Sequence, residues 1–165
     1  MLKVNVADLL RQLGTRREVR RDAKVDGLVL STSRVPDDAT VDAEVTLESV
    51  PNGVMAYGSV TAPWVGACRR CLREATGVAT ARFRELFERR PTEGETYRLA
   101  GEEVDLEPLV REAVLLELPL APLCQDDCRG LCPQCGADLN EGGCDCPAVE
   151  TDPRWAALDE LRFDP

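Results

Sequence analysis

Apolar and polar side chains alternate most regularly in the middle of the chain, between residues 41 and 50. A period of two is typical of a β-strand that buries one face. The turn residues Pro51, Asn52 and Gly53 follow, and residues 54–62 resume the alternation. Together they predict an antiparallel hairpin with one buried face. The apolar set of the first strand is Val41, Ala43, Val45 and Leu47, and its polar set is Asp42, Glu44, Thr46 and Glu48.

The segments around this hairpin have weaker patterns. Residues 74–88 predict a third strand, because apolar side chains again recur at every second position over much of it. Upstream, residues 4–13 predict a short strand and then a helix that Asp8 caps and Gly14 ends. The basic residues 15–24 suit a strand or an exposed loop, residues 25–30 suit a short strand, and the polar residues 91–101 suit a loop or linker.

The pattern becomes helical from Asp105 onward. Asp105 can cap a helix, Pro108 is acceptable in its first turn, and Pro119 ends it. The segment has little polar surface, so we expect this helix to cover the apolar face of the sheet. The predicted fold is α+β: a small antiparallel β-sheet, partly barrel-like, covered by a helix and followed by a Cys-rich zinc-binding module. Asp152 and Pro153 predict a further short helix.

Two domains follow from this division. Residues 1–122 hold the antiparallel sheet and its covering helix. Residues 123–165 hold the Cys-rich metal-binding module and the C-terminal helix. At 165 residues the chain is long enough for one domain with a small metal-held appendage.

Six of the eight cysteines lie between residues 124 and 146, and the chain has no histidine. A metal site would therefore use thiolates, with carboxylate oxygen as the other available ligand. Cys132 and Cys135, followed by Gly136, have the form of a zinc knuckle, in which two thiolates lie on a tight turn. Cys144 and Cys146 lie a short loop away, so these four cysteines predict one tetrahedral site.

A second site can be formed by Cys68, Cys71, Cys124 and Cys128, although spacing alone does not decide which pairs meet. Four thiolates close a zinc site and leave no position for water, so we expect Zn²⁺ to be structural and not catalytic. Three alternatives remain open: an iron–sulfur site, which also takes four cysteines, a redox-active CxxC thiol, and disulfides in an exported chain.

Charge is distributed unevenly along the chain. The net charge is −10, and residues 92–165 hold five arginines against 18 acidic residues. The overall field therefore repels phosphate and argues against a general DNA-coating protein. Local basic patches remain candidates for RNA phosphate, with an ordinary solvated face as the alternative. Their residues are Arg16, Arg17, Arg20 and Arg21 in one patch and Arg69, Arg70 and Arg73 in the other.

Most enzyme classes find no support in the sequence. Without histidine there is no Ser-His or Cys-His nucleophile, and no glycine-rich phosphate loop is present. We therefore expect a protein that is not an enzyme and has no small-molecule substrate. The chain has no apolar run long enough to span a bilayer, and its first residues do not resemble a signal peptide. We expect a cytoplasmic protein that does not contact membranes.

Four motifs follow one another along the chain: C-R-R-C-L (68–72), D-L-E-P-L-V-R-E-A-V-L-L-E-L-P (105–119), C-R-G-L-C-P-Q-C-G-A-D-L-N-E-G-G-C-D-C (128–146) and D-P-R-W-A-A-L-D-E-L (152–161). As a set they resemble the YceD-type large ribosomal RNA subunit accumulation proteins, a bacterial family with relatives in plastids. The resemblance implies a non-enzymatic role in building or maintaining large-subunit ribosomal RNA.

The residue patterns and the family resemblance together lead to one functional hypothesis and one alternative. The hypothesis is a ribosome biogenesis factor whose partners are precursor ribosomal RNA or the assembling large subunit. The acidic C-terminal half also suits a basic ribosomal protein. The alternative is a zinc-stapled protein–protein adaptor, for example one linked to transcription, that does not contact RNA.

Overall fold

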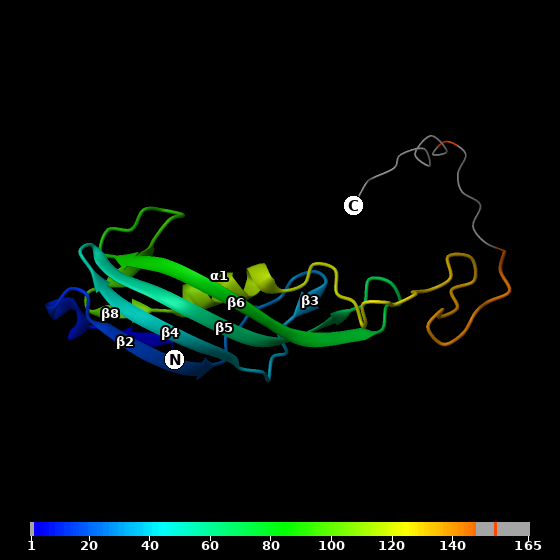
Figure 1. The fold of residues 1–165 in the computed structure, drawn as a ribbon, viewed down its shortest axis with the longest axis horizontal. Coiled ribbons are helices and arrows are strands. Elements are labelled where there is room, and N and C mark those ends of the chain that lie inside the picture. Colours follow the sequence, from blue (N-terminus) through cyan, green and yellow to red (C-terminus); the bar gives the residue numbers. More distant parts are fainter. Residues whose placement is uncertain (1, 148–153, 155–165) are drawn as a thin grey trace, which may run out of the picture. The chain divides into compact units, whose positions relative to one another are not determined.

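The computed structural model describes residues 2–147 and 154. Its residues group into two compact units, Met1–Cys128 and Arg129–Pro165, and each is described by itself. The first unit is built on one eight-stranded sheet with the order β1-β8-β7-β6-β5-β4-β2, and β3 pairs with β5 (Figure 1). The strands are β1 (Lys3–Asn5), β2 (Arg16–Ala23), β3 (Ser33–Arg34), β4 (Val41–Val50), β5 (Gly53–Ala67), β6 (Glu74–Glu88), β7 (Tyr97–Ala100) and β8 (Glu103–Asp105).

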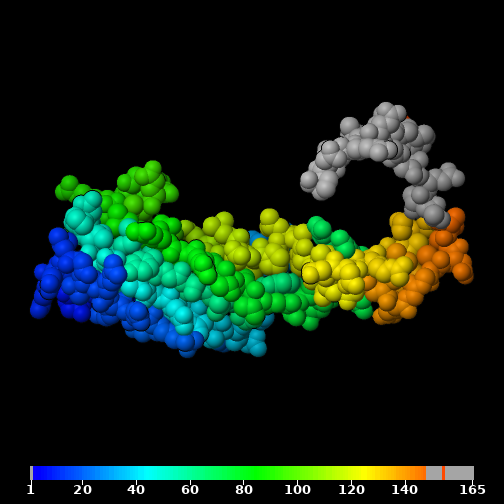
Figure 2. Space-filling view, viewed as in Figure 1, coloured from blue at the N-terminus to red at the C-terminus, as the bar shows by residue number. Residues whose placement is uncertain are grey.

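The predicted hairpin is confirmed as β4 and β5, and the predicted third strand as β6. The three strands pair antiparallel in sequence order, and the hairpin turn places Val50 opposite Gly53. Burial along β4 alternates as the sequence predicted, since one face points into the core. The β4–β6 strands (cyan to green) are visible as surface on the face turned to the reader (Figure 2).

The helix predicted after Asp105 is also present, as α1 (Glu107–Glu117). The Asp105 carboxylate accepts a hydrogen bond of 3.0 Å from the Glu107 N–H at its first turn. One side of α1 packs on β6 and β5 and is buried in the same core as the sheet. The buried residues of α1 are Leu109, Val110 and Val114.

Two segments differ from the prediction. Residues 25–30 form no strand, because Gly27 turns the chain in the left-handed region and only an isolated bridge joins Val29 to Arg34. Residues 91–101 are more than a loop, since Tyr97–Ala100 forms β7. The Tyr97 ring stacks on Phe87 with centroids 5.2 Å apart, and β7 runs parallel to β6. The sheet is therefore mixed and larger than predicted.

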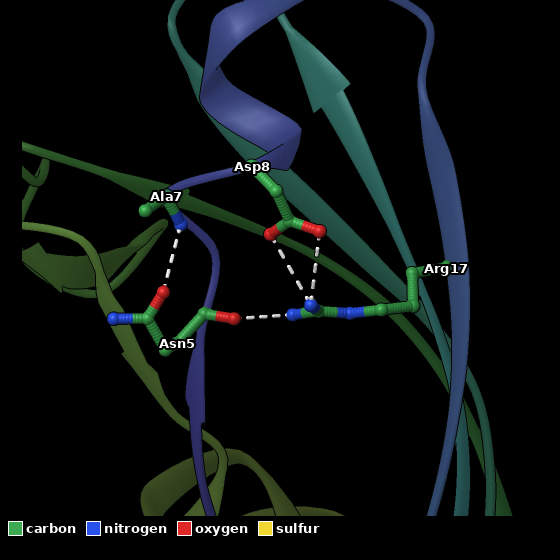
Figure 3. A network of polar contacts seen from close by, with 4 residues as sticks. All are labelled: Asn5, Ala7, Asp8 and Arg17. Atoms are coloured by element: carbon green, nitrogen blue, oxygen red, sulfur yellow. Dashed lines mark hydrogen bonds and ion pairs between the residues drawn. The ribbon is translucent and has the colours of Figure 1, made fainter.

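The N-terminal segment forms β1 and then a 3-10 helix, η1 (Leu9–Arg11), instead of a capped α-helix. Asp8 makes no capping hydrogen bond, so that part of the prediction is wrong. Its carboxylate instead accepts hydrogen bonds of 3.2 and 3.3 Å from Arg17 Nη1, while Arg17 Nη2 donates to the Asn5 carbonyl (Figure 3). Arg17 thereby joins β2 to the chain entering η1.

One predicted element cannot be compared with the structure. The C-terminal helix predicted from Asp152 and Pro153 lies outside the described residues. No helix among the described residues is both long enough and apolar enough to cross a membrane.

Candidate metal centres

The first group of four thiols lies in the Met1–Cys128 unit. Cys68 and Cys71 occupy the turn that joins β5 to β6, and Cys124 and Cys128 follow α1. The four Sγ atoms lie within 4.8 Å of one another. Cys68 is fully buried, and Cys71 and Cys128 are nearly so. Two segments more than 50 positions apart in the sequence therefore bring their sulfur atoms to one point.

The sulfur spacing fits a single tetrahedral ion. A Zn–S bond of about 2.3 Å places two ligand sulfurs of a regular tetrahedron about 3.8 Å apart. The Sγ atoms of Cys68 and Cys128 are 3.8 Å apart, and those of Cys71 and Cys124 are 3.5 Å apart. Both separations are far longer than a disulfide bond of about 2.05 Å, and all eight cysteines are free thiols. This group can hold a metal ion.

The backbone of the Cys68–Cys71 turn has the geometry of a knuckle. The Leu72 N–H donates to the Cys68 carbonyl at 2.9 Å, and the Cys68 N–H donates to the Arg73 carbonyl at 2.8 Å. Leu72 has a φ of 61°, a left-handed conformation that is uncommon for a residue with a side chain. The turn thus holds both thiols on one side of a tight backbone loop.

The second group of four thiols lies in the Arg129–Pro165 unit and repeats this geometry. The Gly136 N–H donates to the Cys132 carbonyl at 2.9 Å, and the Cys132 N–H donates to the Ala137 carbonyl at 2.8 Å. Gly136 has a φ of 75°, in the region that glycine adopts without a Cβ clash. The Sγ atoms of this group also lie within 4.8 Å of one another, and its members are Cys132, Cys135, Cys144 and Cys146.

Polar side chains shape the turns of the second group. The Arg129 N–H donates to Asn140 Oδ1 at 2.8 Å, and the Asn140 N–H donates to Asp138 Oδ1 at 2.8 Å. In the described part of this unit, Cys132 is the one buried hydrophobic side chain, and Leu131 and Leu139 are half-buried. Since residues 129–147 bury so little apolar surface, hydrogen bonds and the thiol group are the main stabilising contacts of this described part.

Each group contains thiols whose proton affinities diverge. Backbone hydrogen bonding, first from Cys71, lowers the pKa of Cys68 to about 6, while burial raises the pKa of Cys124 to about 12. Hydrogen bonds from the Cys135 and Gln134 backbone lower the pKa of Cys132 to about 6. The side-chain hydrogen bond with Cys135 is the main cause that raises the pKa of Cys146 to about 12. A cation that bound either group would displace the protons that its thiols carry.

The arginines near the first thiol group form hydrogen bonds with it and with the chain that leads to its second cysteine pair. Arg70 Nη1 donates to the Cys128 carbonyl at 2.8 Å, and the Arg73 side chain, as the largest cause, lowers the pKa of Cys71 by hydrogen bonding to its thiol. The Arg69 backbone N–H donates to the Pro122 carbonyl at 2.9 Å. These contacts fix the turn against the second ligand pair and offset thiolate charge. RNA binding by Arg69, Arg70 and Arg73 stays a prediction.

The arginines of β2 have partners within the first unit. Arg16 pairs with Glu48 at 3.1 Å, and Arg20 pairs with Asp42 at 2.5 Å and with Glu44 at 2.9 Å. Arg17 binds Asp8, and Arg21 donates to the Arg20 carbonyl. These four side chains remain candidates for RNA binding, but Arg16, Arg17 and Arg20 would share their charge with acidic neighbours.

The grouping of the thiols matches the two predicted sets, and their binding of metal remains a prediction. The sequence left the set with Cys68 and Cys71 open because spacing alone does not decide which cysteine pairs meet in space. The backbone hydrogen-bond pattern that the Cys68–Cys71 and Cys132–Cys135 turns share became visible only in the structure. The roles of Arg70 and Arg73 were also missed, since their partners depend on the contact between residues 68–73 and 122–128.

Fold and sites together define a β-sheet protein that carries two candidate Cys₄ metal centres. The chain belongs to the family of the large ribosomal RNA subunit accumulation protein YceD, whose profile matches residues 56–162 and so includes both thiol groups. An uncharacterized protein of Mycobacterium tuberculosis is 37% identical over 169 residues, which cover 97% of this chain and 81% of that protein.

Two further relatives extend the comparison. The Mycobacterium leprae relative, also uncharacterized, is 36% identical over 74% of this chain and 59% of its own length. The Arabidopsis thaliana protein named large ribosomal RNA subunit accumulation protein YCED homolog 1, chloroplastic, is 38% identical over 36% of this chain and 19% of its own length. No solved structure matches the chain.

Proposed function

We propose that this protein supports the synthesis, processing or accumulation of large-subunit ribosomal RNA in the bacterial cytoplasm, as a binding protein without catalytic activity. The observation that carries the proposal is the family match over residues 56–162, because the family description names this RNA. The name of the Arabidopsis relative refers to the same RNA. Its partners would be precursor ribosomal RNA or the assembling large subunit.

Structural zinc is the second part of the proposal. Each group offers four thiols and no other ligand type, which suits a closed tetrahedral Zn²⁺ site. In the first group the ion would join the β5–β6 turn to the chain after α1. In the second it would stabilise a unit whose described residues bury little apolar surface. The chemistry that zinc supplies here is cross-linking, since a closed site has no position for a reacting water.

Depletion of the protein tests the proposed role directly. We expect the ratio of large-subunit to small-subunit ribosomal RNA to fall and large-subunit precursors to change in amount, both measured by quantitative RNA blotting. Restoring the protein from a plasmid should restore the ratio. An unchanged ratio and unchanged precursors after depletion would contradict the proposal.

A protein–protein adaptor is the second candidate, and the charge distribution favours it. Residues 92–165 hold 18 acidic residues against five arginines, which suits a basic partner such as a ribosomal protein. An adaptor of this kind would not need to contact RNA. Ultraviolet crosslinking in cells distinguishes the two, because only direct contact recovers large-subunit RNA with the protein after denaturing purification.

A further inference from the structure

One face of the β5–β6 hairpin carries an aromatic ring beside two arginines. In the register of this hairpin Tyr57 lies opposite Arg84, and Ser59 lies opposite Arg82. Residues directly opposite in an antiparallel pair point to the same face of the sheet. Their neighbours of the other parity, such as Val60, are buried in the core that α1 shares. We name these four residues, Tyr57, Ser59, Arg82 and Arg84, the β5–β6 stripe.

The arginines of the neighbouring strand β2 form ion pairs with acids of β4, so the stripe is the cationic part of this face. The acids of β4 are engaged by β2, since Glu48 pairs with Arg16 and both Asp42 and Glu44 pair with Arg20. All five side chains belong to the same face as the stripe by register. With Glu18 and Asp22 of β2, this face of β2 and β4 holds two arginines against five acids, so the stripe is its cationic part.

Arg82 and Arg84 differ from the arginines of β2. Among the described residues, neither makes an ion pair within 4.0 Å, and both are exposed. The adjacent strand β5 contains no acidic residue from Gly53 to Ala67. The acids of β6 are Glu74 and Glu88 at the two ends of the strand and Glu85, which has the opposite parity to Arg82 and Arg84. In a protein with a net charge of −10, two arginines without an ion-pair partner among the described residues form a local attraction for anions.

The stripe also has a hollow that can receive a flat group. A shallow depression of about 470 Å³ is lined by Tyr57, Arg82 and Arg84, together with the ion pair of Arg16 and Glu48. The Tyr57 ring is half-buried, so its position is fixed while part of it stays accessible. Aromatic rings held on a sheet surface stack on nucleic-acid bases, and the gain does not depend on the base.

We propose that the β5–β6 stripe binds single-stranded RNA, with Tyr57 stacking on a base and Arg82 and Arg84 binding successive phosphates. The two arginines lie two residues apart on one strand, about 7 Å, which lets each reach its own phosphate along an extended strand. The inference rests on the proposed function, because it names the surface through which this protein would contact ribosomal RNA.

A binding assay with a short RNA tests the stripe. The probe is a fluorescein-labelled 12-nucleotide oligouridylate, and the readout is fluorescence anisotropy with the full-length, zinc-loaded protein. Replacing both arginines by glutamate (Arg82→Glu with Arg84→Glu) should weaken binding by about 30-fold or more. Replacing both by alanine should reduce the slope of log affinity against log salt by about 1.4, since each lost phosphate contact removes about 0.7.

The ring gives an independent test. Tyr57→Ala should weaken binding by about 5- to 150-fold, the range expected for loss of one stacked base. Tyr57→Phe keeps the ring and should bind as the wild type does. A 12-residue polyglutamate peptide serves as an anion without bases. If it competes as well as the RNA, or if Tyr57→Ala binds normally, the stripe is a general anion surface and the inference is overturned.

A matched charge control separates the stripe from the overall field. Arg11 and Lys24 are exposed and lie outside the sheet strands. Arg11→Glu with Lys24→Glu changes the net charge as much as the double glutamate variant of the stripe, and should weaken RNA binding by less than about threefold. Equal losses in the two double variants would overturn the inference. Far-UV circular dichroism and thermal unfolding confirm that each variant is folded.

Cells distinguish failure of the stripe from failure of the proposed function. In the depleted strain, the double glutamate variant of Arg82 and Arg84 should fail to restore the large- to small-subunit RNA ratio, while the Arg11 and Lys24 control restores it. If the stripe variant restores the ratio, the inference is overturned and the proposed function stands. If depletion of the wild type leaves the ratio unchanged, the proposed function fails whatever the oligonucleotide assay shows.

Discussion

Breaking the first thiol group should weaken the sheet without abolishing it. The substitution is Cys71→Ser, which removes one of the four sulfurs that an ion would join. Cys71 and Cys124 lie 53 positions apart, so an ion that holds both closes a long loop in the unfolded chain. In the chain-entropy treatment of cross-links, closing a loop of this length stabilises the folded state by about 4 kcal/mol.

The core of the first unit decides what remains after this loss. Phe87, Leu47 and Val110 are almost completely buried and belong to one continuous cluster that does not depend on the thiols. The sheet should therefore stay folded in Cys71→Ser, and its thermal midpoint should fall by on the order of 10–20 °C. Removing zinc from the wild type with a chelator under reducing conditions should lower the midpoint by a similar amount.

Thermal unfolding followed by far-UV circular dichroism measures this effect. Cys135→Ser is the matched control, because Cys135 belongs to the group inside the Arg129–Pro165 unit, and the transition of the sheet should be unchanged. The reasoning is refuted if zinc-loaded wild type and Cys71→Ser unfold at the same temperature. It is also refuted if Cys135→Ser lowers the midpoint of the sheet as much as Cys71→Ser does.

Three further predictions concern packing and metal release. Gly58→Ala should destabilise the protein by about 2 kcal/mol in urea unfolding, since its Cβ would lie 2.0 Å from the Glu44 carbonyl oxygen, whereas Gly142→Ala, with open space, should not. Phe87→Ala should cost about 3–5 kcal/mol, because Phe87 is 1% exposed, and Leu116→Ala, at 87% exposure, close to nothing. Acidification should release metal to a chromophoric chelator, because protons compete for the thiolates; equal retention at pH 5 and pH 8 would contradict thiolate ligation.

The central strands could be predicted because their burial has a local signature. Each residue of β4 and β6 that points into the core alternates with one that does not, so the period of two is visible in the sequence. β7 has four residues and gains its stability from a parallel neighbour that is distant in the sequence. Such a strand has no local signal strong enough to separate it from a loop.

The thiol groups show where spacing stops being informative. A CxxC pair predicts its own turn, and both turns have the expected geometry. Which pairs meet depends on how α1 returns the chain to the end of the β5–β6 hairpin, and that is a property of the whole unit. The ion pairs of Arg16 and Arg20 also could not be predicted from the sequence, because their partners are set by the register of β2 on β4.

The metal content of the purified protein tests the account of the two centres most directly. Native mass spectrometry and elemental analysis, on protein purified under reducing conditions without added zinc, should find about two zinc ions per chain. Cys71→Ser and Cys135→Ser should each lose about one of them. Iron in place of zinc, or a wild-type chain that binds no metal, would contradict the account that two closed zinc sites hold this protein's binding surfaces in place.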